Sequence, residues 1–61
     1  MDAVIFDRTH KDYLIIEKGP MEPFWWTKEK DKATKMHYLK AMEKLKELWQ
    51  LSIDAVLEVV E

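Results

Sequence analysis

Mostly apolar residues follow one another at alternating spacings of four and three along the second half of this sequence. Neither glycine nor proline interrupts residues 28 to 61, where good helix formers dominate. Because an α-helix turns once every 3.6 residues, this spacing places the whole series on one helix face. We therefore predict a long amphipathic helix over residues 28 to 60, with Thr27 as its N-cap and Asp31 as an alternative start. The series is Tyr38, Met42, Leu45, Trp49, Ser52, Val56 and Val59.

The first part of the chain has the composition of a β-hairpin. Two runs rich in β-branched and aromatic residues, 3–6 and 13–16, flank a polar segment. We predict a hairpin over residues 3 to 17. Successive side chains of a strand point to opposite faces, so both faces of this hairpin are apolar. One face can pack on the helix, and the other needs a different cover.

A turn and three adjacent aromatic residues connect the hairpin to the helix. Residues 18 to 27 contain the only glycine and both prolines of the chain, which end a regular ladder. Phe24, Trp25 and Trp26 then form either a short third strand or an extended connector. In both cases neighbouring rings point to opposite faces, so at least one should stay exposed. Together these elements predict an α+β fold in one domain, residues 1–61.

The predicted helix is too long for the rest of the chain to cover. Sixty-one residues bury little surface, and without cysteine no disulfide can reinforce them. A helix of about 30 residues measures about 45 Å, whereas strands of five or six residues reach about 17–20 Å. Either the helix breaks near residues 32–35 and folds back, or it stays long and packs against another chain. We expect the second arrangement.

The charge distribution is consistent with a homodimer. Residues 28–46 carry seven lysines and three acidic residues, and residues 47–61 carry four acidic residues and no basic one. Two such helices packed antiparallel would place each basic half beside the other's acidic half. Solvated charges without such a role are the common alternative explanation. The residues predicted to self-associate are Tyr38, Met42, Leu45, Leu48, Trp49, Ile53, Val56, Leu57 and Val60.

No group of residues predicts catalysis or a bound metal. His10 and His37 have no second ligand at helical spacing, and Ser52 lies within the apolar series without the partners of a nucleophilic triad. A single glycine provides no phosphate-binding loop. We expect no enzymatic activity, no catalytic residue, no cofactor and no metal.

The aromatic residues predict the main function. Aromatic side chains are common anchors of protein interfaces, so Phe24, Trp25 and Trp26 predict contact with a larger protein partner. The chain would occlude or modulate that partner, as a phage-type inhibitor of host machinery does. We find no secretory signal and no apolar stretch long enough to cross a bilayer, so we expect a cytoplasmic protein without a membrane contact.

The lysines support an alternative function. A dimeric regulator could contact nucleic-acid phosphates through the lysine-rich start of the helix, at Lys28, Lys30, Lys32 and Lys35. The net charge of −2 and the carboxylates between these lysines make this the weaker hypothesis.

Overall fold

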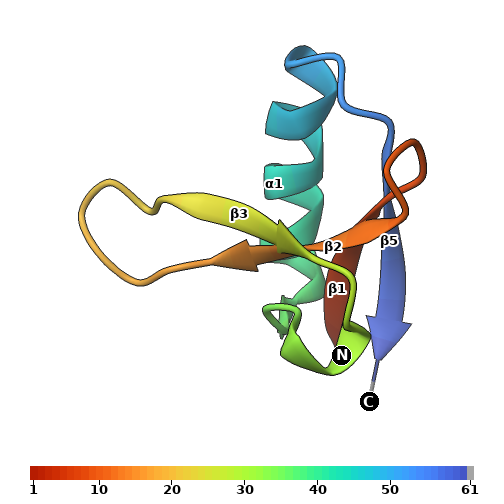
Figure 1. The fold of residues 1–61 in the computed structure, drawn as a ribbon. Helices are drawn as coiled ribbons and strands as arrows, with labels where there is room; N and C mark the ends of the chain where they lie inside the picture. Colours follow the sequence, from red (N-terminus) through yellow and green to blue (C-terminus); the bar gives the residue numbers. More distant parts are fainter. Residues whose placement is uncertain (61) are drawn as a thin grey trace.

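A five-stranded antiparallel sheet and one α-helix form the protein (Figure 1). The computed structural model describes residues 1–60; residue 61, the last of the predicted domain, lies outside the described residues. In chain order the elements are β1 (Asp2–Asp7), β2 (Asp12–Ile16), β3 (Phe24–Thr27), the 3-10 helix η1 (Lys30–Lys32), β4 (Met36–His37), α1 (Tyr38–Gln50) and β5 (Ala55–Val60). The predicted α+β class, the hairpin and the third strand are confirmed. No helix in the described part of the chain is long and apolar enough to cross a membrane.

Strand β1 is the centre of the sheet. On one side it pairs with β5 over its whole length, from Asp2 opposite Val60 to Asp7 opposite Ala55. On the other side β2 pairs with the second half of β1, and the short β4 pairs with its first half. Since β3 pairs with the outer side of β2, β3 and β5 are edge strands on opposite sides of β1, and the two-residue β4 is a third, short edge.

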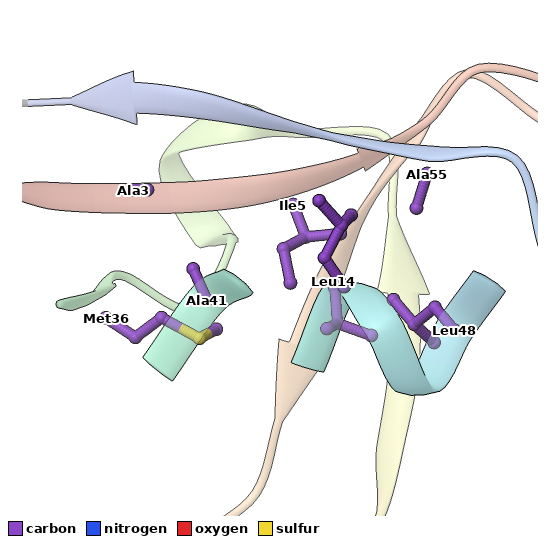
Figure 2. Packing of buried hydrophobic residues seen from close by; sticks show 8 residues of the cluster. Ala3, Ile5, Leu14, Met36, Ala41, Leu48 and Ala55 are labelled. Atoms are coloured by element: carbon purple, nitrogen blue, oxygen red, sulfur yellow. The ribbon is translucent and has the colours of Figure 1, made fainter. Parts of the chain in front are cut away.

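The core lies between α1 and one face of the sheet (Figure 2). Ile5 and Leu14 from the strands are fully buried and belong to one cluster with Leu45 and Leu48 of the helix. Four of the ten buried apolar residues are alanines, which let the helix approach the sheet closely but bury little apolar area. The residues of the cluster are Ala3, Ile5, Leu14, Met36, Ala41, Leu45, Leu48 and Ala55.

Residues 28–35 provide the cover for the second face of the hairpin. Val4 points away from the helix cluster, yet it is fully buried, and Ala33 is buried too. Thr34 fixes this segment to β2: its hydroxyl accepts a hydrogen bond from the N–H of Ile16 at 2.8 Å, and its own N–H donates to the Leu14 carbonyl at 3.0 Å. The expected second cover therefore exists, but it comes from residues that we predicted to be helical.

The prediction of one helix over residues 28 to 60 is wrong at its start. The helix begins at Tyr38, and His37, not Thr27 or Asp31, is its N-cap. The His37 ring accepts a hydrogen bond from the N–H of Leu39 at 3.2 Å. Residues 28–37 instead form a short 3-10 turn, an extended segment and β4, because they gain more by pairing with the sheet than by extending the helix.

The prediction is also wrong at the end of the helix, which is residue Gln50. Ser52 adopts a left-handed conformation (φ 64°), and its N–H donates to the carbonyl of Trp49. The N–H of Ile53 donates to the carbonyl of Leu48 at 3.0 Å, and Ile53 packs against the core cluster that contains Leu48. These two bonds and the apolar contact form a Schellman motif with serine at the position usually held by glycine. The chain then reverses into β5.

A buried carboxylate organises the turn between β1 and β2. Asp7 accepts hydrogen bonds from the N–H groups of Thr9, at 2.9 Å, and His10, and its second oxygen lies 2.7 Å from the His10 ring. Burial opposes ionisation of this carboxylate, but the hydrogen bonds outweigh burial and hold the pKa of Asp7 below its ordinary value of 3.8.

Candidate functional site

The hairpin of β2 and β3 separates the three adjacent rings. Trp26 lies opposite Leu14 and Phe24 lies opposite Ile16, so both rings are on the face of the sheet that α1 covers. Their centroids are 6.1 Å apart in a T-shaped arrangement. Trp25 lies opposite Ile15 on the other face, as alternation along the strand requires.

The connection between β2 and β3 extends beyond the body of the protein (Figure 1). The N–H of Glu17 donates to the carbonyl of Pro23 at 2.9 Å, and the N–H of Glu22 donates to the carbonyl of Gly19 at 3.2 Å. Gly19 has φ 152°, a conformation that side chains disfavour. The loop therefore closes on itself and holds the start of β3 away from the core.

Three apolar side chains are exposed on this projection. Met21 is 86% exposed, Trp25 45% and Phe24 39%. We call Met21, Phe24 and Trp25 the hairpin end. Trp26, the third ring of the sequence motif, is half-buried and packs against the core cluster. The trio thus divides into one ring that supports the fold and two that solvent reaches.

Ion pairs connect the hairpin to the helix. The carboxylate of Glu22 lies 3.6 Å from Lys40 and 3.9 Å from Lys44. Lys44 also lies 3.4 Å from Glu47, and its side chain is largely buried. A shallow cavity of about 220 Å³ opens beside these contacts, with Ile16, Thr34 and Met36 among its lining residues. Ligand pockets are commonly about 300–1,000 Å³, so this cavity is small for an organic substrate.

Most lysines of the alternative hypothesis face carboxylates. Lys30 lies 3.0 Å from Glu58, which raises the pKa of Lys30 through hydrogen bonding and charge. Lys32 lies 2.8 Å from Glu29. Lys28 donates to the carbonyl of His10 and lies 3.8 Å from Asp12, and Lys35 lines the cavity. These pairings reduce the positive field that phosphate binding needs.

The residues predicted to self-associate fall into three environments. Leu45 and Leu48 are core residues. Tyr38, Met42 and Trp49 are exposed on α1, and the remaining residues belong to the half-buried turn and strand after the helix: Ile53, Val56, Leu57 and Val60. A long helix packed against a second long helix is therefore excluded, because the helix ends at Gln50 and two of these leucines are already covered.

The histidines and Ser52, the residues considered for catalysis or metal binding, have structural contacts. His10 and Asp7 close the first turn, His37 caps α1, and Ser52 ends it. Within residues 1–60 no three histidine, cysteine or acidic residues are grouped to hold a metal ion.

Comparison with protein-family models, curated proteins and solved structures found no match to this chain. Its function is therefore argued from its own surface.

Proposed function

We propose that this chain is a small, non-catalytic protein-binding module, and that it occludes or modulates a larger protein partner through the hairpin end. The observation that carries the proposal is the exposure of Trp25 and Phe24 on a projecting hairpin whose third ring, Trp26, is anchored in the core. A rigid support for exposed rings lowers the entropy lost on binding. The predicted long helix gives this proposal no support, because α1 ends at Gln50.

Two features favour a protein partner over other ligands. The exposed groups are large and apolar, and residues of this kind provide most of the energy at protein interfaces. The nearby charges of Glu22, Lys40 and Lys44 compensate one another, which suits a polar rim better than an attraction to phosphates. Steric occlusion requires no catalytic group.

The test is affinity capture from an extract of the native host with three immobilised proteins: the wild type, Trp25→Ala, and Leu51→Ala as a matched control. Leu51 is also an exposed apolar residue, but it directly follows the last residue of α1 and lies outside the hairpin of β2 and β3. We expect a host protein that the wild type and Leu51→Ala retain and Trp25→Ala loses. Loss of an interface anchor commonly costs about 2 kcal/mol or more, which is about 30-fold in affinity.

Circular dichroism of each variant keeps the result interpretable, because Trp25→Ala must retain the fold. Washing with high salt separates the two hypotheses. Apolar contact survives high salt, whereas phosphate contact weakens steeply. Equal capture by Trp25→Ala and the wild type, or capture of nucleic acid that salt releases, would contradict the proposal.

A further inference from the structure

Strand β5 has a neighbour on one side only. It pairs with β1 over its full length, and no other strand among residues 1–60 pairs with it. In Figure 1 it lies at the opposite edge of the sheet from β3. Proteins often protect such edges with lysine, proline or a bulge, but β5 (AVLEVV) has neither lysine nor proline and is paired without interruption.

Hydrogen bonds near the start of β5 show which of its backbone groups point outward. The N–H of Arg8 donates to the carbonyl of Asp54 at 2.9 Å, one residue before the strand. In an antiparallel ladder every second residue bonds to the same neighbour, so the even-numbered residues of β5 bond to β1 and the odd-numbered residues point away from it. The carbonyl of Ala55 agrees with this assignment, because it accepts a hydrogen bond from the Trp49 indole at 2.9 Å.

Two residues of the outward side remain open. The N–H of Ala55 already donates to the carbonyl of Ile53 at 2.9 Å, and its carbonyl is occupied by Trp49. Leu57 and Val59 are the other odd-numbered residues of β5. Each therefore presents one N–H donor and one carbonyl acceptor at the sheet edge.

Among the described residues 55–60, one antiparallel register of two β5 strands joins all of these open groups. When Leu57 lies opposite Val59 of a second copy, and Val59 opposite Leu57, the two strands exchange four hydrogen bonds. If Leu57 faced itself, Val59 would lie opposite Ala55, whose groups are taken. If Val59 faced itself, Leu57 would have no partner among residues 55–60, the described residues of β5.

We propose that β5 is a dimerisation edge, and that two copies of this chain join their sheets across a twofold axis at Glu58. In this register Val56 faces Val60 of the second copy, so apolar side chains meet on both sheet faces. The two Glu58 carboxylates face each other, and each has a cation 3.0 Å away in Lys30. This ion pair reduces the repulsion that opposed like charges cause in a sheet.

The surroundings of β5 fit a second copy. Trp49 is 54% exposed, Val59 53% and Met42 43%. The seven-residue spacing of Met42 and Trp49 places them on one stripe of α1, and the bond to Ala55 places that stripe beside the outer side of β5. Twofold pairing of the strands brings the two stripes toward one another and covers apolar area that is open in one chain. A second copy of this chain is the expected partner of β5, because in this register every open N–H of one β5 strand meets an open carbonyl of the other.

A single introduced cysteine tests the register, because the chain has none of its own. Glu58 would form a non-hydrogen-bonded pair with itself, with Cα atoms about 4.5 Å apart, within the range of about 4.4–6.8 Å that a disulfide spans. We expect Glu58→Cys to form a disulfide-linked dimer under mild oxidation. Val56→Cys is the matched control, because four residues would separate its two sulfurs along the strands, about 13 Å, and it should stay unlinked.

A second variant tests the hydrogen bonds without disturbing the contact with β1. Val59→Pro removes an outward N–H, and proline is tolerated at such edge positions. We expect the wild type to sediment as a dimer at micromolar to millimolar concentration, Val59→Pro to sediment as a folded monomer, and Glu58→Cys/Val59→Pro to lose the disulfide. Circular dichroism checks each fold.

The proposal is overturned if the wild type stays monomeric and Glu58→Cys forms no disulfide-linked dimer. The same two results are expected if a strand of another protein, and not a second copy, pairs with β5. The proposal is equally overturned if Val56→Cys links as readily as Glu58→Cys, or if Val59→Pro leaves the dimer intact.

Discussion

The turn after α1 makes a sharp prediction, because Ser52 occupies a conformation that suits glycine. Its φ of 64° places it in the left-handed region, which costs a residue with a side chain about 1–2 kcal/mol. Ser52→Gly removes that strain, while the greater freedom of glycine in the unfolded chain returns about 0.5–1 kcal/mol. We expect a net gain of about 0.5–1 kcal/mol in the free energy of unfolding. For a domain of this size that corresponds to an increase in Tm of about 2–8 °C.

Thermal and urea unfolding, followed by circular dichroism, measure this gain. Leu51→Gly is the control, since the neighbouring Leu51 is also exposed but has an ordinary φ of −91°. Without strain to relieve, it should lose about 0.5–1 kcal/mol. Ser52→Ala keeps the strain and should not stabilise. If Ser52→Gly destabilised the protein as much as Leu51→Gly does, the Schellman end of α1 and the reversal into β5 would both be wrong.

Three further substitutions test other contacts. Asp7→Asn should cost about 1–3 kcal/mol of unfolding free energy at neutral pH. Because folding lowers the pKa of Asp7, the stabilisation from its carboxylate is complete above about pH 4 and is lost as the pH falls through the folded pKa. Acid titration should therefore destabilise the wild type more than the variant. Thr34→Val leaves the N–H of Ile16 without its acceptor and should cost about 1–3 kcal/mol in urea unfolding; a change near zero would contradict the role of residues 28–35 as a cover. Arg8→Ala breaks an exposed ion pair with Asp54 and should change stability by less than about 1 kcal/mol in the same assay.

The sequence was informative where local signals and tertiary contacts agree. Residues 3–17 have strand composition around a polar turn, and the structure forms β1 and β2 there. The alternation of rings in residues 24–26 correctly predicted that Trp25 would point away from Trp26. Helix was correctly predicted for residues 38–50, but of the predicted apolar series only Leu45 is buried there, whereas Tyr38, Met42 and Trp49 are exposed.

The sequence misled where a tertiary contact outweighs local propensity. Ser52 adopts the left-handed conformation without being glycine, so no residue type marked the end of the helix. A signal for β5 was present: residues 53–60 contain four β-branched residues, and apolar residues there depart from the single stripe of a helix. A single helix over residues 28 to 60 does not account for that departure, which reflects a strand with two partly covered faces.

The candidate surface changed for the same reason. The length mismatch between helix and sheet does not exist, because α1 has 13 residues and β5 returns along β1. What remains exposed is divided between the hairpin end near β3 and the stripe beside β5. The sequence identified Trp25, Met42 and Trp49 as candidates for contact. It did not indicate that Trp25 lies near one edge of the sheet whereas Met42 and Trp49 lie near another.

The separation of these two edges predicts that the two proposed activities are independent. β3 pairs with β2 and β5 pairs with β1 on the side away from β2, so pairing through β5 leaves both hairpin ends of a dimer free. Trp25→Ala should therefore leave the sedimentation of the wild type unchanged. Val59→Pro should capture the same host protein as the wild type and release it at the same rate, because the hairpin end takes no part in the pairing of β5 strands.

Each variant is thus the control for the other. Trp25→Ala that retains its fold and loses dimerisation would show that the hairpin end contributes to self-association, and Val59→Pro that retains its fold and captures nothing would place the partner at β5. Either result would show that the hairpin end and β5 belong to one binding surface. Independent losses would instead show that β5 joins two copies while each hairpin end binds its own partner molecule.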